Sequence, residues 1–176
     1  FQTTFYLAVN KLVVEQCAGE IATQVQGVKF ISYDARRWLS GVDNLVYLYS
    51  REGPRFYPRP ARGVWQGATV TYVALQLAYA MGFDQVILIG VDHAYTAAGE
   101  PHQTVVSPGP DPNHFDQDYF GKGFRWQLPD LALSEQAYRL ARQAFEQDGR
   151  VVLDATVQGK LQVFPKVDYW SLFGNA

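Results

Sequence analysis

Hydrophobic residues recur along the chain with two different periods, which predict two kinds of secondary structure. Short runs rich in aromatic and β-branched residues predict strands, and they occupy residues 4–10, 27–32, 44–50, 84–90 and 150–156. Longer runs with helical spacing lie between them, at residues 10–25, 67–82 and 132–149. Because strands and helices alternate, the pattern predicts an α/β fold with a mostly parallel sheet.

Capping and turn residues support these boundaries. Asn10 is a good N-cap for the first helix. The helix of residues 67–82 is apolar on nearly every face and reaches Gly82, a residue type that favours helix ends, so we expect a buried helix that ends there. The strand of residues 84–90 has an unbroken apolar centre, which is typical of a parallel strand covered on both faces.

A long segment over residues 94–130 interrupts the alternation. Its prolines exclude a helix across it, and a loop of this length is either functional or disordered. Its many aromatic residues favour a loop that packs, and the apolar tail of residues 160–173 is also expected to pack on the body. The chain therefore predicts a single α/β domain over residues 1–176, with one long loop.

Composition narrows the class of protein. Hydrophobic residues make up 48% of the 176 residues and charged residues 18%, so a packed core is expected. A net charge of −2 argues against a broad surface for nucleic acid, and no apolar run reaches the ~18 residues of a membrane span. The single cysteine fits a reducing, cytoplasmic location. The chain begins without Met on a strand-like run, so we expect a fragment of a longer protein, and an oligomer is left open.

Polar residues follow three of the predicted strands at the point where each strand ends. These residues are Asn10 after the first strand, Gly90 and Asp92 after the fourth, and Asp154 after the last. Open α/β sheets bind ligands beyond the carboxyl ends of their strands, so we expect these residues to converge on one edge. Asp92 is either a ligand-binding carboxylate or the cap of a loop.

The start of the helix at residues 67–82 supplies a second element of the expected site. Gly67, Ala68 and Thr69 are small enough for a ligand to approach the backbone, and free amides together with the helix dipole favour an anion. The alternative is that Gly67 and Thr69 simply start and cap the helix. The turn matches neither a Walker loop nor the dinucleotide fingerprint.

Several further residues carry two interpretations each. His93 is either an acid, base or orienting group, or a half-exposed histidine. His114 and Tyr119 belong either to a ligand-binding cluster or to a solvated loop, and the spacing matches no standard zinc motif. Thr156 and Lys160 follow the last strand, where Lys160 either meets a phosphate or faces solvent. No metal ligand is assigned.

The segments that carry these residues resemble a known family. The run "GATVTYVALQLAYAMGFDQVILIGVDHAYT" is similar to the shared core of the 6-hydroxymethylpterin diphosphokinase-like family, which includes bacterial domains of unknown function. The runs "NHFDQDYFGKGFRWQLPD" and "LDATVQGKLQVFPKVDY" look like its bacterial branch. The same core is similar to the bacterial sialyltransferases of glycosyltransferase family 42. The resemblance implies a Rossmann-like three-layer fold from which this chain lacks the first strand and its phosphate loop.

The resemblance also implies roles for individual residues. Residues 67–69 and 90–92 correspond to turns that line the nucleotide pocket of the sialyltransferases. Those enzymes have two aromatic residues after the equivalent of Asp92, one of which holds the leaving phosphate. Here His93 and Ala94 stand at those positions, and Tyr95 corresponds only with a shift of one residue.

Three functions follow from the resemblance. The first is a nucleotide- or nucleotide-sugar-binding transferase, most of all a sialyltransferase-related glycosyltransferase with a CMP-sugar donor. The second is a diphosphokinase acting on a hydroxymethylpterin-like substrate, with Mg²⁺ held by carboxylates such as Asp92 and Asp116. The third is a non-catalytic accessory module in surface glycosylation, because the sialyltransferases carry a catalytic histidine just before the helix matching Leu133–Gln147 and this chain has none there.

Overall fold

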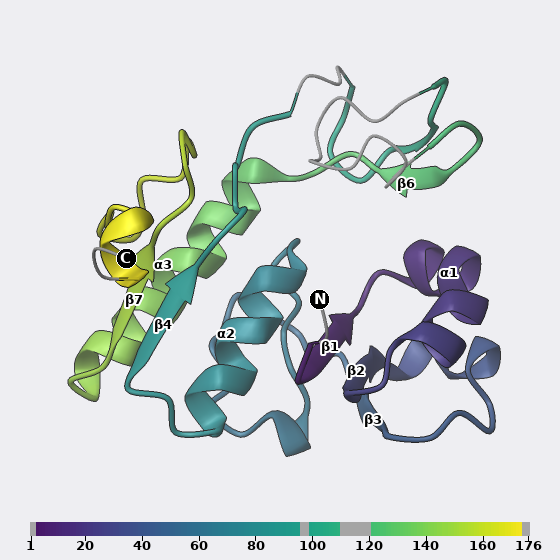
Figure 1. The fold of residues 1–176 in the computed structure, drawn as a ribbon, viewed down its shortest axis with the longest axis horizontal. Coiled ribbons are helices and arrows are strands. Elements are labelled where there is room, and N and C mark those ends of the chain that lie inside the picture. The colour runs from purple at the N-terminus through teal and green to yellow at the C-terminus, as the bar shows by residue number, and fades with distance from the viewer. Residues whose placement is uncertain (1–2, 96–98, 110–120, 174–176) are drawn as a thin grey trace.

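A computed structural model describes residues 3–95, 99–109 and 121–173 of the chain. Within these residues the fold is α/β, with short and mostly parallel strands in small sheets (Figure 1). The strands are β1 (Phe5–Ala8), β2 (Val28–Ser32), β3 (Leu45–Leu48), β4 (Gln85–Leu88), β5 (Thr104–Val106), β6 (Arg125–Gln127) and β7 (Val151–Asp154). The helices are α1 (Lys11–Gln24), α2 (Val70–Ala80) and α3 (Leu131–Gln147), and short 3-10 turns lie at Tyr33–Trp38, Pro60–Arg62 and Trp170–Phe173.

The elements expected from the hydrophobic pattern are present, with ends that differ by a few residues. Asn10 caps α1 as predicted, because its Oδ1 accepts a hydrogen bond of 2.9 Å from the Leu12 amide. Gly82 follows the end of α2 with a φ of +86°, the left-handed conformation in which glycine terminates helices. None of the helices in the described ranges is both long and apolar enough to cross a membrane.

Two separate parallel sheets form the body. Strands β1, β2 and β3 lie side by side in a 3-stranded sheet, and β4 pairs with β7 in a 2-stranded sheet. The sequence pattern predicted a single mostly parallel sheet, and the structure corrects this prediction. The sheets are separate because, within the described residues, no strand lies between β1 and β4 to pair with both.

The sequence predicted one long loop over residues 94–130, and the structure corrects this prediction. Strands β5 and β6 pair antiparallel, with Val105 opposite Trp126. The pairing continues through a hydrogen bond of 2.8 Å from the Ser107 amide to the Phe124 carbonyl. A hairpin forms inside a proline-rich stretch because the two short runs that pair contain no proline themselves.

The sheet of β1, β2 and β3 is covered by a helix on each face. Ala8 of β1 packs in a buried cluster with Val14 of α1. The preceding residue, Leu7, packs in a different cluster that contains Val73 of α2. Because successive residues of a strand point to opposite faces, α1 and α2 lie on opposite sides of this sheet.

Helix α2 packs against the second sheet as well. Tyr72 and Leu75 belong to a buried cluster that also contains Leu88 of β4 and Phe145 of α3. The sequence of α2 contains no charged residue, which agrees with a helix that is covered on more than one side. One helix therefore contacts both sheets and determines how they are held together.

A buried polar side chain fixes α2 against the preceding loop. Gln76 is completely buried, and its Nε2 donates a hydrogen bond of 2.8 Å to the Trp65 carbonyl. Its Oε1 accepts a hydrogen bond of 3.2 Å from the Tyr57 amide. Buried backbone groups need such partners, so Gln76 attaches the loop that follows β3 to the helix.

The segment after β7 packs on the body, as its apolar sequence predicts. Leu161 is completely buried, and Phe164 is nearly so. The Asp154 amide donates a hydrogen bond of 2.9 Å to the Pro165 carbonyl, and the Val167 amide donates one of 3.0 Å to the Asp154 carbonyl. This pairing covers the outer edge of β7 at its carboxyl end.

We expect Gln76→Leu to lower the free energy of unfolding by about 1–3 kcal/mol, because it leaves the Trp65 carbonyl and the Tyr57 amide without partners. Urea unfolding monitored by tryptophan fluorescence measures the change. Gln143→Leu, on the exposed side of α3, is the matched control and should stay within about 0.5 kcal/mol of the parent. Equal effects of the two substitutions would contradict the role assigned to Gln76.

Candidate functional site

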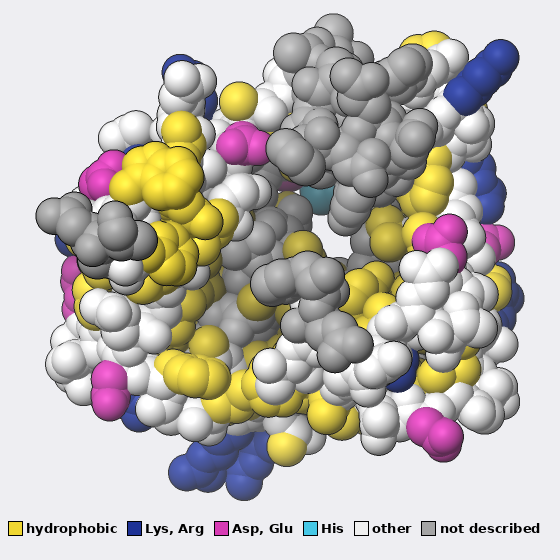
Figure 2. All heavy atoms as spheres, in the orientation of Figure 1, with side chains coloured by type: hydrophobic (Ala, Val, Ile, Leu, Met, Phe, Trp, Pro, Cys, Tyr) yellow, Lys and Arg dark blue, Asp and Glu magenta, His cyan; other side chains and the backbone are white. Residues whose placement is uncertain are grey.

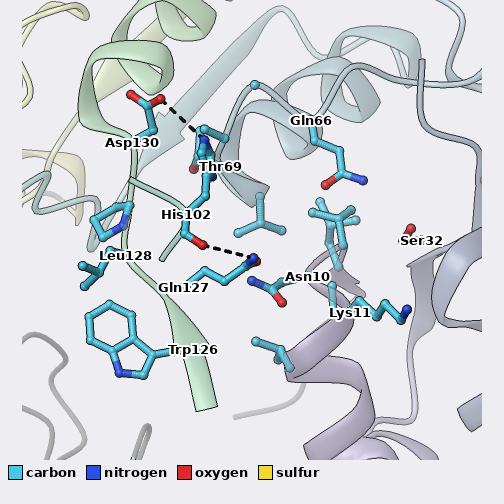
Figure 3. A pocket seen from close by; sticks show the side chains of 18 of the residues that line it. Asn10, Lys11, Ser32, Gln66, Thr69, His102, Trp126, Gln127, Leu128 and Asp130 are labelled. Atoms are coloured by element: carbon cyan, nitrogen blue, oxygen red, sulfur yellow. Dashed lines mark hydrogen bonds and ion pairs between the residues drawn. The ribbon is translucent and has the colours of Figure 1, made fainter. Parts of the chain in front are cut away.

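The surface is hollowed between the two halves of the molecule (Figure 2). A cavity of ≈ 640 Å³ lies there, bounded by the carboxyl end of β1, the turn before α2 and the segment from β6 to α3 (Figure 3). Along the chain, β1, β2 and β3 proceed outward on one side, and β4 and β7 proceed outward on the other. The volume suits a small organic ligand, and the cavity lies beyond the carboxyl end of β1, where α/β sheets commonly bind ligands.

The amino end of α2 opens into this cavity. Residues Gly67 and Ala68 both adopt left-handed backbone conformations, with φ of +57° and +59°. Thr69 is the N-cap, and its Oγ1 accepts a hydrogen bond of 3.3 Å from the Thr71 amide. The amides of Ala68 and Val70 have no hydrogen-bond acceptor within the described part of the chain. They are therefore available to an anion, which the helix dipole also favours.

Packing alone explains why residue 67 is glycine. A Cβ atom at this position would lie 2.6 Å from the Cβ of Ala137 and 2.7 Å from the Cδ1 of Tyr72. These distances are too short for carbon atoms in contact, so the turn can approach α3 only without a side chain. The close packing on α3 therefore explains the glycine at residue 67, in addition to the approach of a ligand that the sequence suggested.

His93 points into the body of the protein and does not line the cavity. Its side chain is only 8% exposed, and its Nε2 lies 3.4 Å from the Oε1 of Glu135 on α3. The ring also contacts the edge of Tyr138, whose hydroxyl lies 3.2 Å from the Oγ1 of Thr69. Burial raises the pKa of the Tyr138 hydroxyl. His93 therefore fastens the exit of β4 to α3, close to the amino end of α2.

The histidine that does line the cavity is His102, which precedes β5. Its Nε2 lies 3.5 Å from the Oδ2 of Asp130, and Figure 3 shows this pair at the cavity wall. Asp130 is held in place because its Oδ1 accepts a hydrogen bond of 2.8 Å from the Leu133 amide, as the N-cap of α3. The His102 amide in turn donates to the Leu128 carbonyl at 2.9 Å.

Other polar and aromatic groups complete the lining. Lys11 and Asp34 bring one cationic and one anionic side chain to the wall, and Asn10 lies beside Lys11 at the start of α1. Tyr95 and Trp126 stack on each other at 6.4 Å between ring centroids and also line the cavity. Aromatic faces of this kind can hold a flat ring such as a nucleobase.

The remaining predicted site residues gather elsewhere, at the carboxyl ends of β4 and β7. The Val91 amide donates a hydrogen bond of 3.0 Å to the Thr156 Oγ1, and the Lys160 amide donates one of 2.8 Å to the Asp92 carbonyl. Gly90 has a φ of +73° in the same turn. The expected convergence of strand ends is therefore seen for β4 and β7, but these residues do not line the cavity beside Asn10.

Asp154 is occupied by internal contacts. It is completely buried, its Oδ2 lies 2.6 Å from the Nζ of Lys166, and its Oδ1 accepts a hydrogen bond of 2.8 Å from the Thr156 amide. A buried carboxylate needs such partners. Two other predicted residues, His114 and Tyr119, lie outside the described residues.

Sequence reasoning selected neither His102 nor Asp130. Asp130 had a local signal, because it stands directly before the helical run as an N-cap residue. His102 had none, since only the pairing of β5 with β6 brings it to the wall beside Asp130. In the described ranges, no group of three or more His, Cys, Asp or Glu side chains is placed to hold a metal ion.

Comparisons with known proteins identify no relative. No family model matches the chain, and neither the curated proteins nor the solved structures contain a significant match.

We expect Gly67→Ala to destabilise the protein more than Gly82→Ala. Both positions have positive φ, which costs a non-glycine residue about 1–2 kcal/mol. Only residue 67 adds crowding against α3, because nothing lies within 4 Å of a Cβ at residue 82; overpacking of this kind costs about 1–3 kcal/mol more. Chemical denaturation of the two variants measures the difference, and equal losses of stability would exclude the packing explanation.

Proposed function

We propose that this chain is a nucleotide- or nucleotide-sugar-binding transferase domain of cytoplasmic location, and specifically a sialyltransferase-related glycosyltransferase domain that uses a CMP-sugar. The observation that carries the proposal is the amino end of α2, which opens into a cavity at the carboxyl end of β1 with two amides unpaired within the described residues. Phosphate groups bind well at such a helix start. The resemblance to the sialyltransferases supports the choice of donor.

Each wall of the cavity suits one part of a nucleotide sugar. The amides of Ala68 and Val70, with Lys11 nearby, would receive the phosphate. The stacked Tyr95 and Trp126 would support the base. In glycosyl transfer a base removes the proton of the acceptor hydroxyl while the nucleotide phosphate leaves.

His102 would be the base in this proposal. Its Nε2 is directed toward Asp130, which can orient the ring. This assignment replaces His93, whose side chain is enclosed against Glu135.

We also propose that the two parallel sheets are the halves of one Rossmann-like, three-layer arrangement. Three features support this proposal: the order of the strands, the helices on both faces of the first sheet, and the contact of α2 with both sheets. The ligand would then lie in the crevice at which the strand order reverses.

A second candidate function is diphosphate transfer to a hydroxymethylpterin-like acceptor. The observation that favours it is the presence of two carboxylates, Asp34 and Asp130, in the same cavity. Mg²⁺ is commonly held by one or two carboxylates together with substrate phosphates, so Asp34 or Asp130 would be the ligand in this alternative. When bound, Mg²⁺ would neutralise charge on the ATP phosphates.

We expect CMP or a CMP-sugar to raise the melting temperature of the protein. At 100 times Kd, ligand binding contributes about 2.7 kcal/mol, which corresponds to roughly 5–10 °C for a domain of this size. A thermal-shift series with CMP, CMP-sugars, ATP with and without Mg²⁺, and pterins measures the response. Stabilisation by ATP only in the presence of Mg²⁺ would favour the diphosphokinase, and no response to any ligand would exclude both proposals. Binding without turnover of a donor and acceptor would support the accessory module.

We expect Lys11→Gln to weaken the binding of CMP about tenfold, the loss of about 1.4 kcal/mol, because it removes a cation from the cavity wall. Lys160→Gln is the matched control, since Lys160 is exposed and does not line the cavity. Isothermal titration calorimetry measures both values. The reverse result, with Lys160→Gln weakening binding and Lys11→Gln silent, would move the site to the ends of β4 and β7.

A further inference from the structure

The arginines of this chain form two groups that differ in their partners. Each described arginine after residue 120 pairs with a carboxylate of the chain, and these are Arg125, Arg139, Arg142 and Arg150. The six arginines between residues 36 and 62 form no ion pair within the described residues. Residues 1–65 contain 8 Lys and Arg against 5 Asp and Glu, a net charge of +3 in a chain of net charge −2. This part of the molecule therefore offers unpaired cations to an anionic partner.

One of these arginines belongs to an aromatic stack at the carboxyl ends of β2 and β3. The ring of Tyr33 stacks on the ring of Tyr49 with 4.4 Å between their centroids, and the guanidinium of Arg36 lies 4.1 Å from the centroid of Tyr33. Both groups are too close to the ring to share one face, so Tyr33 is held between them. The edge of Tyr47 contacts Tyr33 at 6.1 Å and 90°. The stack is therefore fixed before any ligand arrives.

The outer parts of the stack are open to solvent. Tyr49 is 53% exposed, and Arg36 is exposed as well. Arg51 follows two residues after Tyr49, and because the chain is still extended there, both side chains point to the same face. Arg51 is exposed and uses its Nε in a hydrogen bond of 2.7 Å to the Arg62 carbonyl. We call Tyr33, Arg36, Tyr49 and Arg51 the platform.

The platform adjoins the cavity at two points. The first is Tyr33, which stands between Ser32 and Asp34 in the chain, and both of these residues line the cavity. The second is Ser50, whose Oγ accepts a hydrogen bond of 2.8 Å from the Nε2 of Gln66, another lining residue. The platform is thus continuous with the wall of the cavity.

This part of the wall lies opposite the aromatic residues assigned to the donor. Figure 3 shows Ser32 and Gln66 across the cavity from Trp126. In the proposed function, Tyr95 and Trp126 support the base of the nucleotide. A second substrate would therefore enter the cavity from the side of the platform.

The residue types of the platform suit a sugar that carries an anionic group. The exposed ring of Tyr49 offers a flat apolar surface, against which the C–H face of a sugar ring can pack. Arg36 and Arg51 offer forked N–H donors, which match the geometry of a carboxylate or a phosphate. Because the stack is already ordered, little conformational freedom is lost on binding.

A nucleic acid suits the platform less well. Affinity for RNA or DNA comes largely from contacts with many phosphates, and the platform supplies only two arginines. The carboxylate of Asp34 adds a negative charge at the adjoining wall of the cavity. One anionic group on a sugar needs no more cations than the platform has.

We propose that the platform is the acceptor subsite and that the acceptor is a sugar chain carrying an anionic group. The anionic sugar would lie against Tyr49, with its charge held by Arg36 and Arg51. The next sugar of the chain would reach the cavity past Ser32. The role of acceptor rests on the proposed transferase function, whereas the binding of an anionic sugar is measured without it.

An NMR titration of the ¹⁵N-labelled protein tests the platform directly. The amide signals of Tyr33, Tyr49 and Ser50 are followed as trigalacturonic acid is added, and its neutral methyl ester is the matched control ligand. We expect these amides to shift in a saturable way, and we expect the ester to bind about tenfold more weakly because it cannot pair with the arginines. Added salt should weaken the binding of the acid and leave the ester unchanged. A phosphorylated maltotriose shows whether a phosphate can replace the carboxylate.

Two substitutions separate the platform from a general attraction to positive charge. We expect Arg36→Gln to weaken the binding of trigalacturonic acid about tenfold, and Tyr49→Leu to weaken it by a similar factor because the flat ring is lost. Arg37→Gln is the matched control, since this exposed neighbour stacks on Trp38 at 4.1 Å and does not belong to the platform. Equal losses from Arg36→Gln and Arg37→Gln would overturn the proposal.

The remaining outcomes distinguish this proposal from the proposed function. No saturable shift with either acidic sugar, or equal affinity for the acid and its ester, overturns the acceptor subsite. Tighter binding of a single-stranded RNA oligonucleotide at the same amides assigns the platform to nucleic acid and overturns it as well. CMP is titrated in parallel. Binding of the acidic sugar without a response to CMP supports the platform and contradicts the transferase, and a response to CMP without sugar binding does the reverse.

Discussion

The arrangement of the whole molecule depends on the packing of α2 against two sheets at once. Val73 belongs to the cluster on the first sheet, and Tyr72 belongs to the cluster shared with α3 and the second sheet. Adjacent positions on one helix turn thus face two different cores. Gln76 adds a polar tie to the loop before the helix. Because the same helix begins at the cavity, any change in how α2 packs must also move the turn of Gly67 and Ala68.

Local sequence rules predicted the elements well, because each depends on neighbours along the chain. The Asn10 cap, the glycine at residue 82 and the buried character of α2 all follow from spacing and residue type. The division into two sheets did not follow from the sequence. The pattern of a strand shows that it belongs in a sheet, but it does not show which strands lie beside it. The hairpin of β5 and β6 was missed for a similar reason: runs of 3 residues are too short to show a period.

The candidate site was predicted only in part, and the reason is the gap between β1 and β4. Convergence of strand ends requires a continuous sheet, and here Asn10 and Thr69 meet in one place while Asp92 and Thr156 meet in another. His93 was a reasonable candidate from its position after a strand, but Glu135 follows only after the whole segment of residues 94–130, too far along the chain for a local pattern to reveal their contact. That pair is formed only by the packing of the β4 exit on α3.

The cavity and the packing of α2 are connected, and this has a thermodynamic consequence. A ligand held by the amides of Ala68 and Val70 would contact the turn that precedes α2. That turn packs closely on α3 at Gly67, where a Cβ atom would lie 2.6 Å from the Cβ of Ala137. Contacts made only when the ligand is bound and the turn is packed stabilise both, and the coupling is reciprocal. The affinity of the cavity for an anion and the stability of the packing between α2 and α3 are therefore expected to be linked.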